Sequence, residues 1–137
     1  PGHDVVQSVD MVSEIVSDPF ILGQIAAVHA LSDLYAALAL PTSALAVINL
    51  PAASLAIQTN QLTQILAGAL MSFSEAGVKL SGGHTSEGGA LSVGFSVTGH
   101  TPNNPTITGI PANCSLNENV LVLTKPLGTG VIINTRL

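Results

Sequence analysis

The stretch SDPFILGQIAAVHALSDLYAALALPTSALAVINLP, residues 17–51, decides the fold because its apolar pattern changes from that of a helix to that of a strand. Its first three residues, Ser-Asp-Pro, are a helix-start signal, with an N-cap candidate before a proline in the first turn. From residue 20 to about residue 40, apolar side chains recur at helical spacing, at Ile21, Ile25, Val28, Leu31 and Tyr35. Pro41 is expected to end this helix. The continuous apolar run at 43–50 fits a buried strand.

Shorter patterns on both sides of this stretch predict further strands and a second helix. Residues 4–9 are rich in β-branched side chains and predict a strand that ends at Asp10. Residues 59–76 carry apolar side chains on one helical face and predict the second helix, with Gly77 as its cap. Residues 78–80 predict a short strand that runs directly into a glycine-rich loop at 81–89.

The C-terminal part of the chain predicts mostly strands. Residues 91–98 alternate strictly between apolar and polar side chains, which is typical of a half-buried strand. Its inward-facing residues are expected to be Leu91, Val93, Phe95 and Val97. A turn is expected at 103–105, another strand at 120–124, and a loop or helix start at 125–130 before the apolar residues 131–133.

The order of these elements is strand, helix, strand, helix and then several strands. That order predicts an α+β or α/β fold, with one mixed sheet and helices on one face, and we assign it to the α+β class. The length of 137 residues fits a single domain spanning 1–137.

Composition excludes several classes of function. Three cations (Lys79, Lys125 and Arg136) face eight carboxylates, so the clustered positive charge of a nucleic-acid binder or a polybasic membrane binder is missing. Cys114 is the single cysteine, which excludes a disulfide framework and a cysteine-rich metal site.

The low charge content has its own consequence. Only 8% of residues are charged and the mean hydropathy is +0.55. No charge lies between Asp33 and Glu75, but Pro41 and Pro51 interrupt that run, so the roughly 20 apolar residues of a membrane-spanning helix are not expected. A surface with few charges instead predicts coverage by a partner subunit or a further domain. Residues 1–10 lack the features of a signal peptide, and we expect a cytoplasmic protein.

Few side chains suggest chemistry by spacing alone. Asp33 lies within an apolar helix with no cation near it in sequence, so it is either an exposed helix charge or a ligand for Mg²⁺ that bridges phosphates. Asp10 has the same two interpretations, with turn capping as the structural one. The segment 82–89 fits either an anion cradle formed by backbone N–H groups or a flexible hairpin connection. His84 in that segment suits a ligand, a base or a polar loop residue.

The remaining histidines and the cysteine point to no site. The histidines His3, His29 and His100 show no paired metal spacing and are interpreted as structural or solvent-facing. Cys114 has no evident base near it in the sequence, so no catalytic thiol is assigned.

Six segments taken together resemble a known family. In chain order they are Val-Asp at 9–10, Val-Ser-Asp-Pro-Phe at 16–20, Gly-Gln-Ile-Ala-Ala at 23–27, Ala-Leu-Ser-Asp-Leu-Tyr-Ala at 30–36, Gly-Gly-His-Thr at 82–85 and Thr-Lys-Pro-Leu-Gly-Thr-Gly at 124–130. This series is similar to the N-terminal, ATP-binding domain of selenophosphate synthetase (selenide, water dikinase), within the aminoimidazole ribonucleotide synthetase superfamily. The resemblance runs from about residue 5 to residue 131.

The resemblance implies a function and a site. The family transfers phosphoryl from ATP to selenide, giving selenophosphate, AMP and orthophosphate. Asp10 matches an aspartate at the nucleotide site, and Asp33 matches one that holds Mg²⁺ near the phosphates. Gly83, His84 and Thr85 match residues that contact ATP from the partner subunit. The resemblance also implies a homodimer in which two N-terminal domains complete a closed β-barrel.

The sequence departs from the family pattern in ways that affect activity. The family's glycine-rich N-terminal segment, with its catalytic Cys or selenocysteine and its Lys, has no counterpart here, and neither has the C-terminal domain. Ala-Leu-Ala-Leu at 37–40 stands where the family has Met-Gly-Gly/Ala, and His29 replaces the usual asparagine. We therefore expect a fragment that does not turn over alone, and no residue is assigned as catalytic. The alternatives are a related ATP-dependent enzyme with another acceptor, or a non-catalytic fragment that dimerises.

Overall fold

The computed structural model describes residues 4–102, 120 and 122–135. The chain divides into two units, Pro1–Pro105 and Thr106–Leu137, and each unit is described by itself. The elements of the first unit are, in chain order, β1 (Val5–Ser13), α1 (Pro19–Ala36), β2 (Leu40–Pro51), α2 (Leu55–Glu75), β3 (Lys79–Gly88) and β4 (Ser92–His100).

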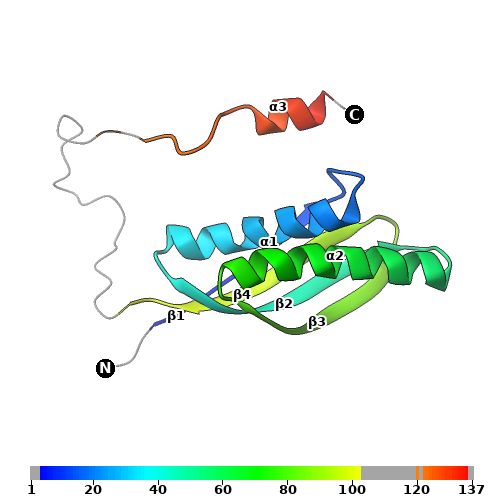
Figure 1. Ribbon diagram of the computed structural model, residues 1–137, viewed down its shortest axis with the longest axis horizontal. Coiled ribbons are helices and arrows are strands. Elements are labelled where there is room, and N and C mark those ends of the chain that lie inside the picture. The colour runs from blue at the N-terminus through cyan, green and yellow to red at the C-terminus, as the bar shows by residue number, and fades with distance from the viewer. Residues whose placement is uncertain (1–3, 103–119, 121, 136–137) are drawn as a thin grey trace. The chain divides into compact units, whose positions relative to one another are not determined.

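The four strands form one mixed sheet in the order β1-β4-β2-β3. The central strand β4 runs antiparallel to both β1 and β2, whereas β3 runs parallel to β2. Both α1 and α2 lie side by side on the same face of this sheet (Figure 1). The predicted mixed sheet with helices on one face is therefore confirmed.

Helix α1 begins where the sequence predicts and ends earlier. Asp18 caps its first turn, because its Oδ1 accepts hydrogen bonds from the backbone N–H groups of Phe20 (2.9 Å) and Ile21 (3.1 Å). The helix stops at Ala36 because Leu38 adopts a left-handed backbone conformation, with φ of 50°. The predicted end at Pro41 is thus wrong, since Pro41 already lies in β2.

Other predicted boundaries shift by a few residues in the same unit. β1 continues beyond Asp10 to Ser13, because all of its residues pair with β4. α2 begins at Leu55 rather than at residue 59, and Gly77, with φ of 69°, follows its end as predicted.

The core lies between the two helices and the sheet. Its largest fully buried side chains are Phe73, Phe95, Leu22, Leu34, Ile48, Ile65, Val93 and Val97. The rings of Phe73 on α2 and Phe95 on β4 meet edge to face with their centroids 4.9 Å apart, a favoured aromatic arrangement. The inward face predicted for 91–98 is confirmed, because all four of its apolar residues are buried.

The glycine-rich segment at 81–89 is mostly strand, which corrects the predicted loop and the hairpin connection. β3 extends through it to Gly88 and pairs with Ser43–Pro51 of β2, with an irregularity between Ala44 and Leu45. Gly83 permits this pairing, because a Cβ there would overlap the backbone oxygen of Ala46. Glycine composition favours a loop, but the backbone hydrogen bonds of the neighbouring strand favour the sheet.

The sheet face opposite the helices is uncovered in this unit. Residues alternate between the two faces of a strand, and Val6 and Val12 of β1 pack toward the core. Exposed apolar side chains on the opposite face include Val9, Met11 and Leu45. On this face the apolar side chains alternate with polar and small residues, among them Gln7 of β1 and Gly94, Ser96 and Thr98 of β4.

The second unit contains one described helix, α3 (Thr129–Asn134), which begins after Gly128 with φ of 107°. Both of the alternatives predicted for 125–130, a loop or a helix start, are found there, because residues 125–128 are in neither helix nor strand and α3 begins at Thr129. The strand predicted at 120–124 is wrong for the residues described there, because Val120 and residues 122–124 pair with no strand in the described chain. The predicted turn at 103–105 and the residues His3, Cys114 and Arg136 lie outside the described residues. None of the helices in the described ranges has the length and apolar character to cross a bilayer.

Candidate functional site

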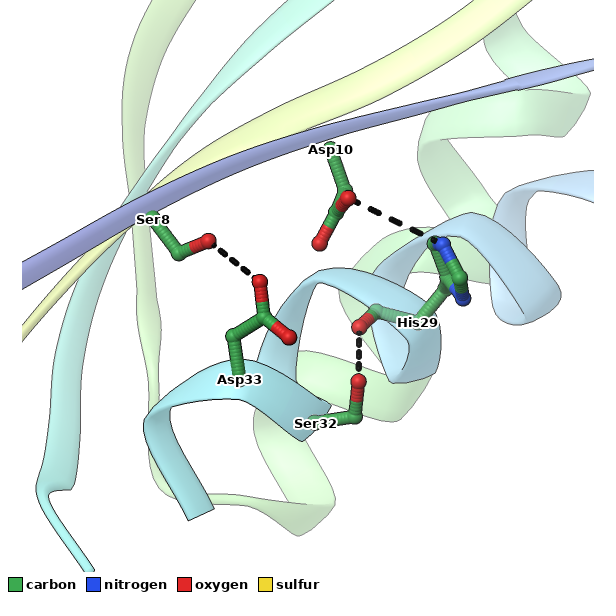
Figure 2. Close-up of polar contacts among 5 residues, drawn as sticks. All are labelled: Ser8, Asp10, His29, Ser32 and Asp33. Atoms are coloured by element: carbon green, nitrogen blue, oxygen red, sulfur yellow. Dashed lines mark hydrogen bonds and ion pairs between the residues drawn. The ribbon is translucent and has the colours of Figure 1, made fainter. Parts of the chain in front are cut away.

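Two carboxylates, Asp10 and Asp33, face the same space between β1 and α1. Because strand side chains alternate, Ser8 and Asp10 both project from β1 toward α1. Asp33 and His29 are one helical turn apart on the side of α1 that faces β1. Figure 2 shows the side chains of Ser8 and Asp10 on one side of this space and those of His29 and Asp33 on the other. The structure therefore brings together the two aspartates that the sequence nominated.

Each aspartate has one polar neighbour across the space. The Ser8 hydroxyl donates a hydrogen bond of 2.7 Å to Asp33 Oδ2. His29 Nε2 lies 3.8 Å from Asp10 Oδ1, which makes an ion pair only when the imidazole is protonated. Asp10 is the more enclosed of this pair, with 28% of its side chain exposed against 53% for His29. His29 is exposed, in agreement with its interpretation as solvent-facing, and it also lies beside Asp10.

The donor set of this site fits a hard cation that also binds phosphate. Among the described residues, no Lys or Arg forms an ion pair with Asp10 or Asp33, so neither carboxylate is neutralised by a permanent positive charge. The described residues contain no group of three or more His, Cys, Asp or Glu arranged to hold a metal. Mg²⁺ is commonly held by one or two carboxylates together with water and substrate phosphates. The residues present therefore fit Mg²⁺ as part of a nucleotide complex.

Gly83, His84 and Thr85 lie on β3, at the opposite edge of the sheet from β1. Two strands, β4 and β2, separate β3 from β1, which corresponds to about 14 Å at ordinary strand spacing. All three residues are exposed. One copy of the chain therefore does not bring the β3 residues to the Asp10 and Asp33 site.

A cavity of about 430 Å³ lies beside β3, where its residues 81–85 meet α2 and β2. Its apolar lining comes from Ala46, Ile48, Leu66 and Leu80. At its far end β3 is attached to α2, because Gln58 Nε2 donates a hydrogen bond of 2.7 Å to Glu87 Oε2. Sequence reasoning missed this cavity, because nothing in the sequence shows that Leu66 and Leu80 approach each other.

Sequence reasoning also left Ser8 and the contact of His29 unrecognised. The usable signals are the spacing of Ser8 two residues before Asp10 on a strand, and of His29 four residues before Asp33 on a helix. Those spacings show that Ser8 and Asp10 share one face of β1, and that His29 and Asp33 share one face of α1. The packing of α1 against β1 then shows that the two faces meet.

Comparison with known families and sequences gives consistent matches. The family described as AIR synthase related protein, N-terminal domain, matches residues 1–101. A selenide, water dikinase from Pelobacter propionicus is 41% identical over 128 residues, which is 93% of this chain and 35% of that protein. The selenide, water dikinase from Caldanaerobacter subterraneus is 42% identical over the same shares of the two chains. The chain thus spans about a third of the length of these curated relatives.

Solved structures share the fold at lower identity. A thiamine monophosphate kinase from Aquifex aeolicus superposes with a TM-score of 0.63 at 20% identity, covering 71% of this chain and 34% of that one. The hydrogenase maturation protein HypE in complex with ATP gives a TM-score of 0.62 at 19% identity, covering 74% and 32% respectively. These likenesses support the architecture of the first unit.

Proposed function

We propose, from the premise that this chain belongs to the AIR synthase related family, that it is the ATP-binding domain of a selenophosphate synthetase-like enzyme. The support for the substrate class comes from the relatives named selenide, water dikinase, at about 41% identity over 93% of this chain. The reaction of the longer enzyme transfers phosphoryl from ATP to selenide, giving selenophosphate, AMP and orthophosphate. The share of that reaction proposed for residues 1–137 is to bind and orient the nucleotide.

The observation that carries this proposal is the arrangement of Asp10 and Asp33 across the space between β1 and α1 (Figure 2). Asp33 is the proposed Mg²⁺ ligand, with Asp10 beside it at the nucleotide. Mg²⁺ supplies neutralisation of the phosphate charge, which is the main requirement of phosphoryl transfer. The two carboxylates hold the nucleotide's phosphates at this face of α1 by attracting the cation that accompanies them.

The β3 residues enter this proposal through a second copy of the chain. Gly83, His84 and Thr85 are exposed at the edge of the sheet far from Asp10, so their proposed contact with ATP is to the nucleotide of a partner subunit. The uncovered sheet face supports a homodimer, because burying exposed Val9 and Leu45 removes apolar surface from water. In the proposed dimer, two such sheets complete a closed β-barrel. We also propose that the protein is cytoplasmic.

The proposal is tested by calorimetric titration of Mg²⁺-ATP into the full chain. Saturable binding is expected for the wild type and a strong loss for Asp33→Asn, which removes the charge and keeps the shape. Glu75→Gln removes one negative charge at the end of α2 and serves as the control, with unchanged affinity expected. Equal binding by wild type and Asp33→Asn would assign Asp33 to the helix surface alone.

The same titration separates the two alternatives. A non-catalytic fragment that keeps the fold and dimerises gives no Mg²⁺-ATP binding but still forms a dimer in sedimentation. A related enzyme with another acceptor binds Mg²⁺-ATP equally well. Selenide-dependent AMP formation by the longer protein then distinguishes selenide from another phosphoryl acceptor.

A further inference from the structure

The hydroxyl of Ser8 makes a short hydrogen bond to the proposed Mg²⁺ ligand. Ser8 lies half-buried on β1, and its Oγ donates to Asp33 Oδ2 at 2.7 Å (Figure 2). An O–H···O⁻ bond of this length is charge-assisted and stronger than a bond between neutral groups. This contact joins the first strand of the sheet to the last turn of α1, across 25 residues of sequence.

The two side chains of this hydrogen bond differ in burial, because Ser8 is half-buried and Asp33 is exposed. All nine residues of β1 pair with β4, so the backbone that carries Ser8 is fixed in the sheet. Asp33 is exposed on its helix, and an exposed carboxylate rotates among several side-chain conformations. The hydroxyl therefore selects the conformation in which the carboxylate faces β1.

We propose that Ser8 is a positioning residue for the nucleotide-bound cation, acting through Asp33. By holding Oδ2, the hydroxyl leaves Oδ1 of Asp33 directed into the space that Asp10 also faces. This inference rests on the proposed function, because it assumes that Asp33 binds the cation. It adds a residue of β1 to the determinants of cation affinity.

A purely structural role for the hydroxyl makes different predictions. The fold of β1 depends on its backbone ladder and on Val6 and Val12, which pack against the core. Removing one hydroxyl from Ser8 leaves these intact. Its loss is therefore expected to change cation affinity more than the integrity of the fold.

The test measures Mn²⁺ binding to the full chain by electron paramagnetic resonance of the free ion, followed by Mg²⁺-ATP calorimetry. Ser8→Ala is expected to weaken Mn²⁺ binding by about tenfold, the lower end of the effect seen when a ligand loses its orienting partner. Ser8→Thr keeps the hydroxyl and is expected to retain the affinity. Ser8→Val has the shape of Thr without the hydroxyl, and valine suits a strand. If Ser8→Ala folds poorly, the Mn²⁺ affinities of Ser8→Val and Ser8→Thr are compared instead.

Ser32→Ala is the matched control at the same site. Ser32 also lies on α1, but its hydroxyl donates to the backbone oxygen of His29 at 2.6 Å and contacts neither carboxylate in Figure 2. Unchanged Mn²⁺ affinity is expected for this variant. An equal loss in Ser32→Ala would assign the effect to general loosening of α1 and overturn the proposal.

A thermal-unfolding cycle tests the contact itself. Ser8→Ala and Asp33→Ala are expected to lower Tm by less together than the sum of their separate effects, because each removes the same hydrogen bond. If the Tm shift of the double variant equals the sum of the two single shifts, the proposal is overturned.

The outcomes also separate this inference from the proposed function. Wild-type binding with equal affinity in Ser8→Ala and Ser8→Val would overturn the role of Ser8 and leave the function standing. Absence of both Mn²⁺ and Mg²⁺-ATP binding by the wild type would overturn the function and this inference together.

Discussion

Gly23 on α1 and Gly68 on α2 face each other's helices in a reciprocal contact. A Cβ on Gly23 would overlap the backbone oxygen of Ile65, and a Cβ on Gly68 would overlap that of Phe20. The backbones of the two helices are therefore in direct contact at these two glycines. A side chain at either position would hold the helices apart. This close crossing fixes how α1 sits on the sheet, and with it the position of Asp33 relative to β1.

Substituting either glycine is expected to destabilise the chain strongly. Gly23→Ala and Gly68→Ala each force a methyl group against backbone that cannot rotate away, at a cost of about 1–3 kcal/mol in the free energy of unfolding. Urea denaturation measures the change. Gly89→Ala is the control, because a Cβ at Gly89 meets nothing within 4 Å. Equal stability of Gly23→Ala and wild type would contradict the close crossing.

The N-caps of the two long helices offer a matched pair. Asp18→Ala removes an Oδ1 acceptor that serves two backbone N–H groups of α1, and we expect a loss of about 1 kcal/mol. Ser54→Ala at the start of α2 removes a side chain that makes no cap hydrogen bond, so a smaller loss is expected. Chemical denaturation of both variants distinguishes them. Similar losses at the two caps would show that the Asp18 contacts contribute little.

The Phe73–Phe95 contact is expected to carry much of the stability of the core. Phe73→Ala leaves a cavity where a fully buried ring meets its neighbour, at a cost of about 3–5 kcal/mol. Ile57→Ala, on the exposed side of α2, is the comparison and is expected to change stability little. Calorimetric unfolding measures both. A small effect at Phe73 would mean that the neighbouring helix collapses into the space.

A charge on the uncovered sheet face tests the proposed homodimer. Leu45→Lys places an ammonium group where the partner's apolar side chains are proposed to pack, and sedimentation is expected to show a monomer. Ile57→Lys adds the same charge on α2 and is expected to leave the dimer intact. A wild-type chain that sediments as a monomer at high concentration contradicts the dimer.

The contact between His29 and Asp10 is expected to contribute little to stability. The 3.8 Å separation and the exposed imidazole make it a weak surface pair, so His29→Gln should change the free energy of unfolding by less than about 0.5 kcal/mol. Urea denaturation measures this change. A loss several times larger would show that the imidazole supports the packing of α1 on β1.

Local sequence patterns predicted much of the fold. The alternation at 91–98 predicted a half-buried strand and named its inward residues correctly, because period-two patterns depend only on which face is buried. The Asp-Pro pair predicted the start of α1 for an equally local reason. The end of α1 was not predictable, because Leu38 adopts a backbone conformation that leucine rarely takes.

Features that depend on distant residues escaped prediction. β3 forms because β2 supplies a neighbouring ladder to a glycine-rich segment, and no local pattern shows that. The aspartates of the candidate site could be nominated from the resemblance, but the contacts of Ser8 and His29 require the placement of α1 against β1. Sequence therefore nominated the residues of the site, and packing defined their neighbours.

The position of β4 in the sheet has a consequence for how the chain acquires its structure during synthesis. Among the described residues, β1 pairs only with β4, and Val5 lies opposite His100, a separation of 95 residues. β1 therefore stays unpaired during synthesis until β4, the last strand of this unit, has been made. Such long-range pairing slows folding and prolongs the exposure of apolar segments. A chain whose synthesis stopped before Ser92 would have β1 without its partner strand and would be a natural substrate for chaperones and proteases.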